Sequence, residues 1–309
     1  MNISTQPKVD WRQLAAQPDP CVVCGGTAAR MLYPATFHAS LDDAPNYFLA
    51  HRTATAHGPI VACNDCGFTF TSPRFSADAY DRIYSSIPVP HEGVSDFDAA
   101  KQARFRRLAG IVRQHVPAGS RLVDFGCGDG AFLRELNDPA AIGFEIGAPE
   151  RRRAGVSDIV LGNWASAVGG PGLESGTFAA VTAFDVLEHL PRLEEDVALV
   201  RSLLVPGGLF FASVPDIASL VARAMGKRWN MLLLEHLWYF SPATFDRFMA
   251  RFGFERVAMQ ALPFDAPLAH VVTRLAQTFG MRGNLVPRGL ARMVLPAPAG
   301  IMLGTYRAV

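Results

Sequence analysis

The chain has 309 residues, and its 29 Lys and Arg side chains nearly balance 28 Asp and Glu side chains, for a formal net charge of +1. With 50% hydrophobic residues and balanced charge, the composition excludes a disordered chain, a collagen-like chain and a polyanion-coating protein. No run of about 18 uncharged apolar residues predicts a membrane span, because prolines and a glycine interrupt the longest candidate, 293–306. The N-terminus has no apolar signal-peptide segment, so we expect a cytoplasmic protein.

Residues 1–80 contain four of the five cysteines, many helix and strand breakers, and a local charge of −1. This segment predicts a small ribbon-like module held together by something other than a hydrophobic core. Residues 81–120 follow as a helical linker and lid. They include a helix at 98–116, in which apolar side chains recur at helical spacing and basic side chains occupy the remaining face.

Residues 121–309 alternate short apolar runs with helical stretches, which is the pattern of a parallel sheet with crossover helices. Five such runs predict the central strands, at 121–125, 141–146, 158–162, 178–184 and 208–214. The order of these elements predicts an α/β fold with a doubly wound, Rossmann-like sheet.

The C-terminal part adds two further strand candidates, 254–261 and 301–308, and completes a seven-stranded sheet. A helix precedes the first of them, with Ser241 as its cap, Pro242 in its first turn and Gly253 at its end. Between the two strands we expect a helical insertion at about 265–296, which contains an amphipathic stretch followed by a Pro/Gly-rich connection.

The most informative motif is Val-Asp-Phe-Gly-Cys-Gly-Asp-Gly at 123–130, a strand that turns through three glycines into a helix. The next strand ends at Glu145, 21 residues after Asp124, where a carboxylate can accept both hydroxyls of a ribose. An Asp at the end of the first strand would repel a phosphate and attract a cationic amino group. The pattern therefore favours a sulfonium amino acid nucleoside over NAD.

Four successive motifs, 123–130, 143–146, 184–190 and 204–209, resemble those of class I S-adenosylmethionine-dependent methyltransferases. The resemblance covers roughly residues 100–261 and implies S-adenosylmethionine as the cofactor. It implies these cofactor-binding residues: Asp124, Gly126, Cys127, Gly128, Gly130, Glu145, Ile146, Asn163, Trp164 and Phe184. Asn163 stands where the family often has Asp, Trp164 could be ordinary packing, and Cys127 is most simply a small residue in the loop.

The two Cys-x-x-Cys pairs are each followed by a glycine that permits a knuckle turn, and together they predict a tetrahedral structural zinc site. The predicted ligands are Cys21, Cys24, Cys63 and Cys66. The 38 residues between the pairs exceed the usual ribbon spacing, so we expect an inserted hairpin. Its histidines, His38, His51 and His57, could replace a cysteine, and two metal-free thiol pairs are the alternative. A closed site of four cysteines leaves the metal no catalytic position.

Two segments beyond the fourth and fifth strands carry candidate bases, His189 and the pair Glu235-His236. The four-cysteine segment, this Glu-His pair and a Tyr-rich approach at Tyr80 and Tyr84 resemble bacterial sugar methyltransferases, including nucleotide-linked deoxysugar C-methyltransferases. The resemblance implies His236 as the base, Glu235 as its orienting partner and Tyr84 near the acceptor. We expect no counterpart of the long extra C-terminal domain of the C-methyltransferases, so their substrate and chemistry are not carried over. His189 could equally be structural, and His236 could cap a loop.

The favoured function is methylation of a small molecule, most simply a sugar, nucleotide sugar or glycan precursor. The alternative is a lipid or quinone-type O-methyltransferase at a membrane surface, because residues 262–309 are amphipathic and carry a local charge of +4. RNA methylation is disfavoured and no nucleic-acid partner is expected, since the chain has no basic excess. A non-catalytic cofactor-binding protein is a further alternative, and the acceptor atom and the oligomeric state stay open.

Overall fold

The structure is a computed structural model, and it describes residues 8–11, 19–48, 56–86, 98–145, 159–161, 167–278, 286–287 and 290–309. Three predicted cofactor residues, Ile146, Asn163 and Trp164, lie outside these ranges, as does His51. The described strands form two sheets, one of seven strands and one of four. Among the described helices, none has both the length and the apolar character that crossing a membrane requires.

The large sheet has the order β10-β11-β8-β7-β4-β5-β6, which confirms the predicted seven-stranded α/β fold. Its strands are β4 (Leu122–Phe125), β5 (Ala141–Glu145), β6 (Ile159–Leu161), β7 (Phe178–Phe184), β8 (Leu204–Pro215), β10 (Phe254–Pro267) and β11 (Val294–Ala308). The five strands from β8 to β6 are parallel, and β11 pairs antiparallel with both β8 and β10. Strand order reverses at β4, so the carboxyl ends of β4, β5 and β7 form the edge at which such sheets bind ligands.

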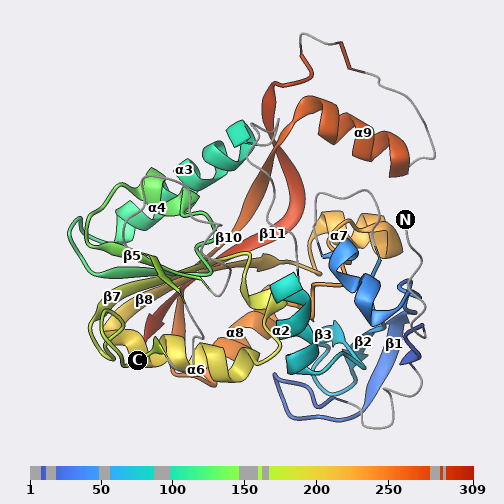
Figure 1. The fold of residues 1–309 in the computed structure, drawn as a ribbon, viewed down its shortest axis with the longest axis horizontal. Helices are drawn as coiled ribbons and strands as arrows, with labels where there is room; N and C mark the ends of the chain where they lie inside the picture. The colour runs from blue at the N-terminus through green and yellow to red at the C-terminus, as the bar shows by residue number, and fades with distance from the viewer. Residues whose placement is uncertain are drawn as a thin grey trace.

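Helices cover both faces of this sheet (Figure 1). On one face lie α3 (Asp98–His115) and α4 (Ala131–Leu136), and on the other lie α6 (Leu193–Leu203) and α8 (Pro242–Ala250). The predicted start of α8 is confirmed, because the Ser241 hydroxyl accepts a hydrogen bond from the Thr244 amide at 3.2 Å. Its apolar stripe, which includes Phe245 and Phe248, is fully buried against the sheet.

Strands β10 and β11 are longer than predicted and continue past the sheet as a two-stranded arm. Ile301 of β11 pairs with Pro215, the last residue of β8, so the preceding part of β11 pairs with β10 alone. The prediction of a Pro/Gly-rich connection was wrong here, because Pro296 is a strand residue opposite Asp265. Proline is tolerated where a strand has a free edge. Helix α9 (Leu268–Thr278) lies at the end of this arm (Figure 1).

The small sheet has the order β1-β2-β3-β9 and joins distant parts of the chain. Its strands are β1 (Ala29–Tyr33), β2 (Ile60–Cys63), β3 (Thr69–Thr71) and β9 (Trp238–Tyr239). The chain between the cysteine pairs contains an antiparallel strand pair, β1 and β2, as the predicted hairpin requires. Its strands are joined by a long connection that includes η1 (Leu41–Tyr47) and not by a tight turn. The other short helices are α2 (Ala77–Ser86), η3 (Leu187–His189), α7 (Leu220–Met225) and η4 (Gly226–Arg228).

One continuous hydrophobic core runs through both sheets. The Phe68 ring stacks on Trp238 with ring centroids 6.2 Å apart and contacts Phe240 at 4.9 Å. Phe68, Trp238 and Phe240 are all buried, and Phe240 also contacts Phe245 of α8 at 4.8 Å. The expectation that the N-terminal segment lacks a hydrophobic core was therefore wrong, because strand β9 brings large aromatic side chains to it.

Candidate functional site

The glycine loop joins β4 to α4 at the carboxyl edge of the large sheet. Gly126 and Gly128 have φ values of +74° and +56°, which side chains with a Cβ rarely adopt. The amides of Gly126 and Cys127 donate to the Phe144 carbonyl of β5 at 2.8 and 3.0 Å, which fixes the loop on its neighbouring strand. A Cβ at Gly143 would lie 2.6 Å from the Cys127 Sγ. Gly143 is therefore needed for the close approach of the loop to β5.

Two carboxylates face this loop, one from β4 and one from β5. Asp124 is 3% exposed and accepts a hydrogen bond from the Thr182 hydroxyl at 2.6 Å. Burial raises the pKa of Asp124 to about 7, the Thr182 bond opposes the rise, and the nearby Glu145 charge adds to it. The Glu145 carboxylate accepts the Gly128 amide at 2.8 Å. The two groups offer acceptors for a cationic amino group and for ribose hydroxyls at one edge.

The other described cofactor candidates surround the same turn. Gly130, with φ +74°, begins α4, and Cys127 is buried against Gly143. Phe184 ends β7 and packs edge-on against Phe132 of α4, with ring centroids 4.9 Å apart. Sequence motifs from three separate strands thus converge on one edge of the sheet.

Sequence reasoning missed a network of charged side chains that holds α3 over this edge. The Arg104 guanidinium, which is buried, lies 2.6 Å from the Asp185 carboxylate, and the Ser213 hydroxyl donates to the same group at 2.9 Å. Arg107, one turn later, pairs with the buried Asp265 of β10 at 2.8 Å. The sequence predicts only that both arginines lie on the polar face of a helix. In the sequence, only its place in the motif 184–190 distinguishes Asp185 from other acidic residues. In the structure, its φ of +57° is unusual for a residue other than glycine.

Next to this network, η3 and the segment before β9 bring two histidines together. The rings of His189 and His236 pack edge-on with centroids 4.7 Å apart. Their Nδ1 atoms lie 3.1 and 2.8 Å from the backbone carbonyls of Glu235 and Met231, respectively. The predicted role of Glu235 as the orienting partner of His236 is therefore wrong, because the Met231 carbonyl orients that ring and Glu235 holds His189 through its backbone.

Burial sets the protonation of this cluster. It lowers the pKa of His189 to about 4 and the pKa of His236 well below its usual value, to which the neighbouring His189 contributes. It also raises the pKa of Glu235 to about 8 and that of Glu188 well above its usual value, with Asp185 adding to the shift at Glu188. Both imidazoles are consequently neutral at pH 7.

The tyrosines of α2 pack within the aromatic core beside the small sheet. Tyr80 is buried at 1% exposure, which makes it a core residue and contradicts its predicted place on an acceptor approach. The Tyr84 ring packs edge-on against Phe48 with centroids 5.4 Å apart and is partly buried. The role of Tyr84 in the site stays a prediction.

The four predicted metal ligands form one cluster, in which every sulfur lies within 4.8 Å of the others. The Sγ distances Cys21–Cys66 and Cys24–Cys63 are both 3.5 Å. Four sulfurs at about 2.3 Å from a tetrahedral zinc ion would lie about 3.8 Å apart, so the cluster fits zinc, whereas a disulfide would need about 2.05 Å.

Both cysteine pairs have the predicted knuckle turns. Gly25 and Gly67 have φ values of +76° and +74°, and their amides donate to the carbonyls of the first cysteine of each pair at 2.7 and 3.0 Å. His57 lies outside the cluster, with its Nδ1 2.7 Å from the Gly58 carbonyl. His38 is likewise not among the clustered side chains.

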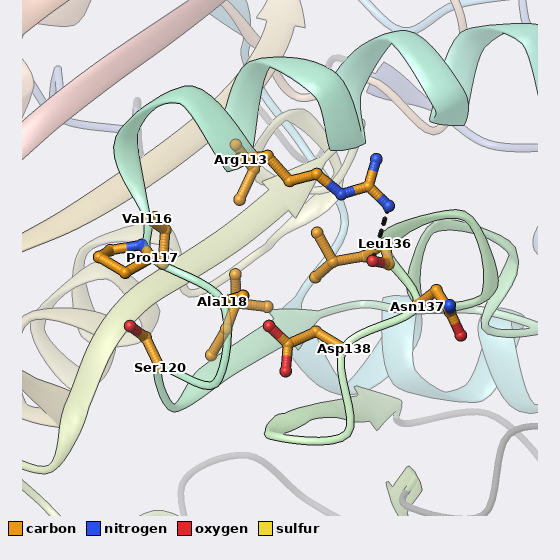
Figure 2. A pocket seen from close by; sticks show the side chains of 10 residues that line it. Arg113, Val116, Pro117, Ala118, Ser120, Leu136, Asn137 and Asp138 are labelled. Carbon is orange, nitrogen blue, oxygen red and sulfur yellow. Dashed lines mark hydrogen bonds between the residues drawn. The ribbon is translucent and has the colours of Figure 1, made fainter.

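A cavity of about 140 Å³ lies at the opposite, amino edge of the large sheet. Figure 2 shows it between the end of α3 and the chain that follows α4, where Arg113 donates to the Leu136 carbonyl at 2.8 Å. Its wall includes Leu122, the first residue of β4, whereas Asp124 and the glycine loop stand at the other end of that strand. This cavity is therefore separate from the candidate cofactor site.

Comparison with known proteins gives one family. The family model described as "Methyltransferase domain" matches residues 99–259, more than half of the chain. A "Ubiquinone biosynthesis O-methyltransferase" of Aromatoleum aromaticum is 25% identical over 194 residues, which are 57% of this chain and 81% of that protein. One of the same description from Burkholderia pseudomallei (strain 1710b) is 27% identical over 172 residues, 50% of this chain and 72% of that protein.

Among solved structures, similarity extends to a Thermotoga maritima protein described as an S-adenosylmethionine-dependent methyltransferase and possible histamine N-methyltransferase. It has 16% identity, a TM-score of 0.45, and coverage of 69% of this chain and 93% of that one.

Proposed function

The chain belongs to the methyltransferase-domain family and is an S-adenosylmethionine-dependent methyltransferase, and we propose that it methylates a hydroxyl oxygen of a small quinone-type or other aromatic acceptor. The observation that carries the proposal is the pair Asp124 and Glu145 beside the glycine loop. A buried carboxylate attracts the cationic amino group of the cofactor, and a second one suits its ribose hydroxyls.

In the proposed complex, Asp124 binds the amino group and Glu145 exchanges its bond with the Gly128 amide for bonds with the ribose. Gly126 and Gly128 let the backbone approach the ligand closely. Gly130, Cys127 and Phe184 shape the wall of the site, and Ile146, Asn163 and Trp164 are proposed to meet the adenine, as the family resemblance implies.

Methyl transfer needs an acceptor oxygen placed in line with the carbon–sulfur bond. The oxygen lone pair forms the new bond to the methyl carbon, the electrons of the breaking bond stay on sulfur, and the hydroxyl proton must leave. His189, His236 and Glu235 are the candidate groups for activating the hydroxyl, because they stand after β7 and before β9, close to the cofactor edge.

Two observations support an aromatic or quinone-type acceptor. The two relatives from Aromatoleum aromaticum and Burkholderia pseudomallei are named ubiquinone biosynthesis O-methyltransferases. The segment just before β11 also has exposed apolar side chains, Leu290 at 48% and Met293 at 46%, and it is hydrogen-bonded to the start of α9. Exposed apolar surface of this kind suits contact with a ring or hydrocarbon chain.

A sugar or nucleotide sugar is the second candidate acceptor. It is favoured by the small sheet that adjoins Glu235-His236, since this arrangement underlies the resemblance to bacterial sugar methyltransferases. We propose structural zinc for Cys21, Cys24, Cys63 and Cys66, and a division into a zinc module at 1–80, a linker and lid at 81–120, and a catalytic domain at 121–309.

Calorimetry with S-adenosylmethionine and, separately, NAD tests the cofactor part. We expect binding of S-adenosylmethionine alone, and NAD binding in its place would contradict the proposal. Transfer of a labelled methyl group then tests the acceptor, with hydroxylated quinols bearing short or long alkyl chains compared with nucleotide sugars. Label on a quinol oxygen supports the first candidate, and label only on sugars replaces it with the second.

A further inference from the structure

A second group of metal-binding side chains lies at the carboxyl edge, apart from the four cysteines. Glu188, His189 and His236 each place a ligand atom within 4.8 Å of the other two. Two imidazoles and one carboxylate form a ligand set for zinc-class divalent ions, and three protein ligands leave a position for a further oxygen. This differs from the cysteine cluster, whose four ligands close the coordination sphere.

Main-chain hydrogen bonds hold this cluster in place from both segments. The Leu237 amide donates to the Glu188 carbonyl at 2.7 Å, which ties the segment before β9 to η3. The contacts of both Nδ1 atoms with backbone carbonyls identify Nδ1 as the protonated nitrogen of each ring. Nε2 then keeps the lone pair, and a carbonyl partner on the other nitrogen is the usual support of a metal-binding histidine.

The carboxylate of Glu188 provides an independent observation. Glu188 is 2% exposed, and its Oε2 atom has no hydrogen-bond partner among the described residues. A buried carboxylate oxygen without a donor loses its hydration with no compensating bond, so it calls for a partner that the described protein atoms do not supply. A cation between Glu188 and the two imidazoles would be that partner.

The charges around the cluster also favour a cation. The acidic groups of Asp185 and Glu235 lie close enough to Glu188 to interact with it electrostatically. Among the described residues, Arg104 is the one positive group with a marked electrostatic interaction with Glu188. Arg104 is already paired with Asp185 at 2.6 Å. Arg104 is therefore not free to partner Glu188, and a cation could take that place.

We propose that Glu188, His189 and His236 bind one divalent metal ion of the zinc class, whose open position takes the oxygen of the acceptor. For its role, this inference rests on the proposed function, because the hydroxyl oxygen of the acceptor is the group expected at the open position. His236 would then be a metal ligand and not a general base.

Metal stoichiometry in the purified full-length protein tests the proposal without cofactor or acceptor. The apoprotein is titrated with Co²⁺ under reducing conditions, and thiolate charge-transfer absorption reports the cysteine site alone. We expect two ions per chain, one with and one without that absorption. One ion per chain, accompanied by the full thiolate absorption, would overturn the proposal.

Variants assign the second ion to its ligands. Glu188→Gln and His236→Gln should each weaken binding of the second ion at least about tenfold and leave the thiolate absorption unchanged. The matched controls are Glu195→Gln, an exposed residue of α6, and His115→Gln at the end of α3, which should both bind two ions. Unchanged affinity for the second ion in both cluster variants would refute the assignment.

Two further readouts separate possible failures. Circular dichroism identifies a variant that does not fold. In that case the number of metal ions bound per wild-type chain decides whether the second site exists, and the unfolded variant is not used. S-adenosylmethionine affinity and methyl transfer by the wild type test the proposed function separately, since the metal count needs neither. A chain that transfers methyl groups but binds only the cysteine-site ion would refute this inference and leave the proposed function standing.

Discussion

The seven-stranded sheet has strands of up to 15 residues and is covered by helices on both faces, whereas strands of the small sheet have two to five residues. Long strands and two covering layers bury enough apolar surface to specify the large sheet by packing. The small sheet depends on additional links: its cysteine cluster, and a fourth strand, β9, contributed by residues 238–239. Short strands with little surface of their own need such links.

The seam between the sheets is also where the candidate chemistry lies. Thr71 of β3 donates from its hydroxyl to the His236 carbonyl at 3.0 Å and from its amide to the Leu237 carbonyl at 2.8 Å. On the other side, Arg251 at the end of α8 donates to the Val22 carbonyl inside the first cysteine pair. A disturbance of the small sheet should therefore reach His236, whereas a disturbance of the glycine loop should stay on the large sheet.

The largest expected effect comes from Cys63→Ser, which removes a buried ligand of the cysteine cluster. Because metal binding and folding of such a site are one equilibrium, we expect loss of its zinc and a fall in thermal stability by several °C or more. Metal analysis and calorimetric melting measure both. Cys127→Ala is the control, since Cys127 lies in the glycine loop, and it should keep its zinc. Full zinc occupancy in Cys63→Ser would point to another ligand set.

Asp124→Asn should affect only the large sheet. Loss of a charge-assisted bond to the cofactor amino group should weaken S-adenosylmethionine binding by about 1–3 kcal/mol, or roughly 5- to 150-fold. Zinc content should not change. Glu174→Gln, an exposed carboxylate paired with Arg121 at the start of β4, is the matched control and should bind normally. Equal affinities in the two variants would remove Asp124 from the cofactor site.

The pH dependence of cofactor binding sharpens the same assignment. With its pKa near 7, Asp124 is largely protonated at pH 6 and ionised at pH 8, and only the ionised form attracts the amino group. Calorimetric affinity should rise on the order of tenfold over this interval, and the rise should be absent in Asp124→Asn. A similar rise in that variant would assign the dependence to another group.

The raised pKa also gives a sign for stability. Because the folded protein holds Asp124 protonated up to about pH 7, its contribution to stability is greatest below its ordinary pKa of 3.8 and is lost as the pH rises through 7. Without cofactor, the wild type should therefore lose stability as the pH rises from 6 to 8. The variant Asp124→Asn has no carboxyl group to ionise at this position, so it should become more stable relative to the wild type over the same interval.

The smallest effect is expected for Thr71→Val at the seam. The substitution keeps the shape of a buried side chain but removes one hydrogen bond to the His236 carbonyl, worth about 1 kcal/mol. We expect a modest fall in melting temperature and a several-fold fall in kcat, with cofactor affinity and zinc content unchanged. Normal kcat would show that the seam does not position His236.

The glycine loop and the cysteine pairs could be predicted because each is a local pattern. In the loop, positive φ values at Gly126 and Gly128 follow from residues adjacent in sequence, and the two knuckles follow from their own glycines. Central strands such as β4 and β7 could be predicted because their apolar runs are buried on both faces and read continuously. The place of Pro296 within a strand could not, since that depends on which edge of β11 has a neighbour.

The contacts among Glu188, His189, Glu235 and His236 could not be predicted, in contrast to these local patterns. The motif at 184–190 indicated His189, and Glu235-His236 was recognised as a pair, but the partners were misassigned. His236 is oriented by the Met231 carbonyl, and one oxygen of Glu188 has no hydrogen-bond partner within the described part of the chain; neither feature has a sequence signature. Hydrogen bonds to backbone carbonyls depend on the path of the chain, not on the type of residue that supplies the carbonyl.

The sequence by itself determined the α/β sheet, the glycine-loop motif and the members of the cysteine cluster, because strand burial, glycine turns and cysteine spacing act over short stretches of chain. The tertiary structure alone decided that β9 joins the small sheet, that Arg104 reaches Asp185, and that Glu188 meets two histidines from segments 47 residues apart. Such contacts form only when packing of the complete core brings distant segments together, since their loop-closure entropy must be offset by burial elsewhere.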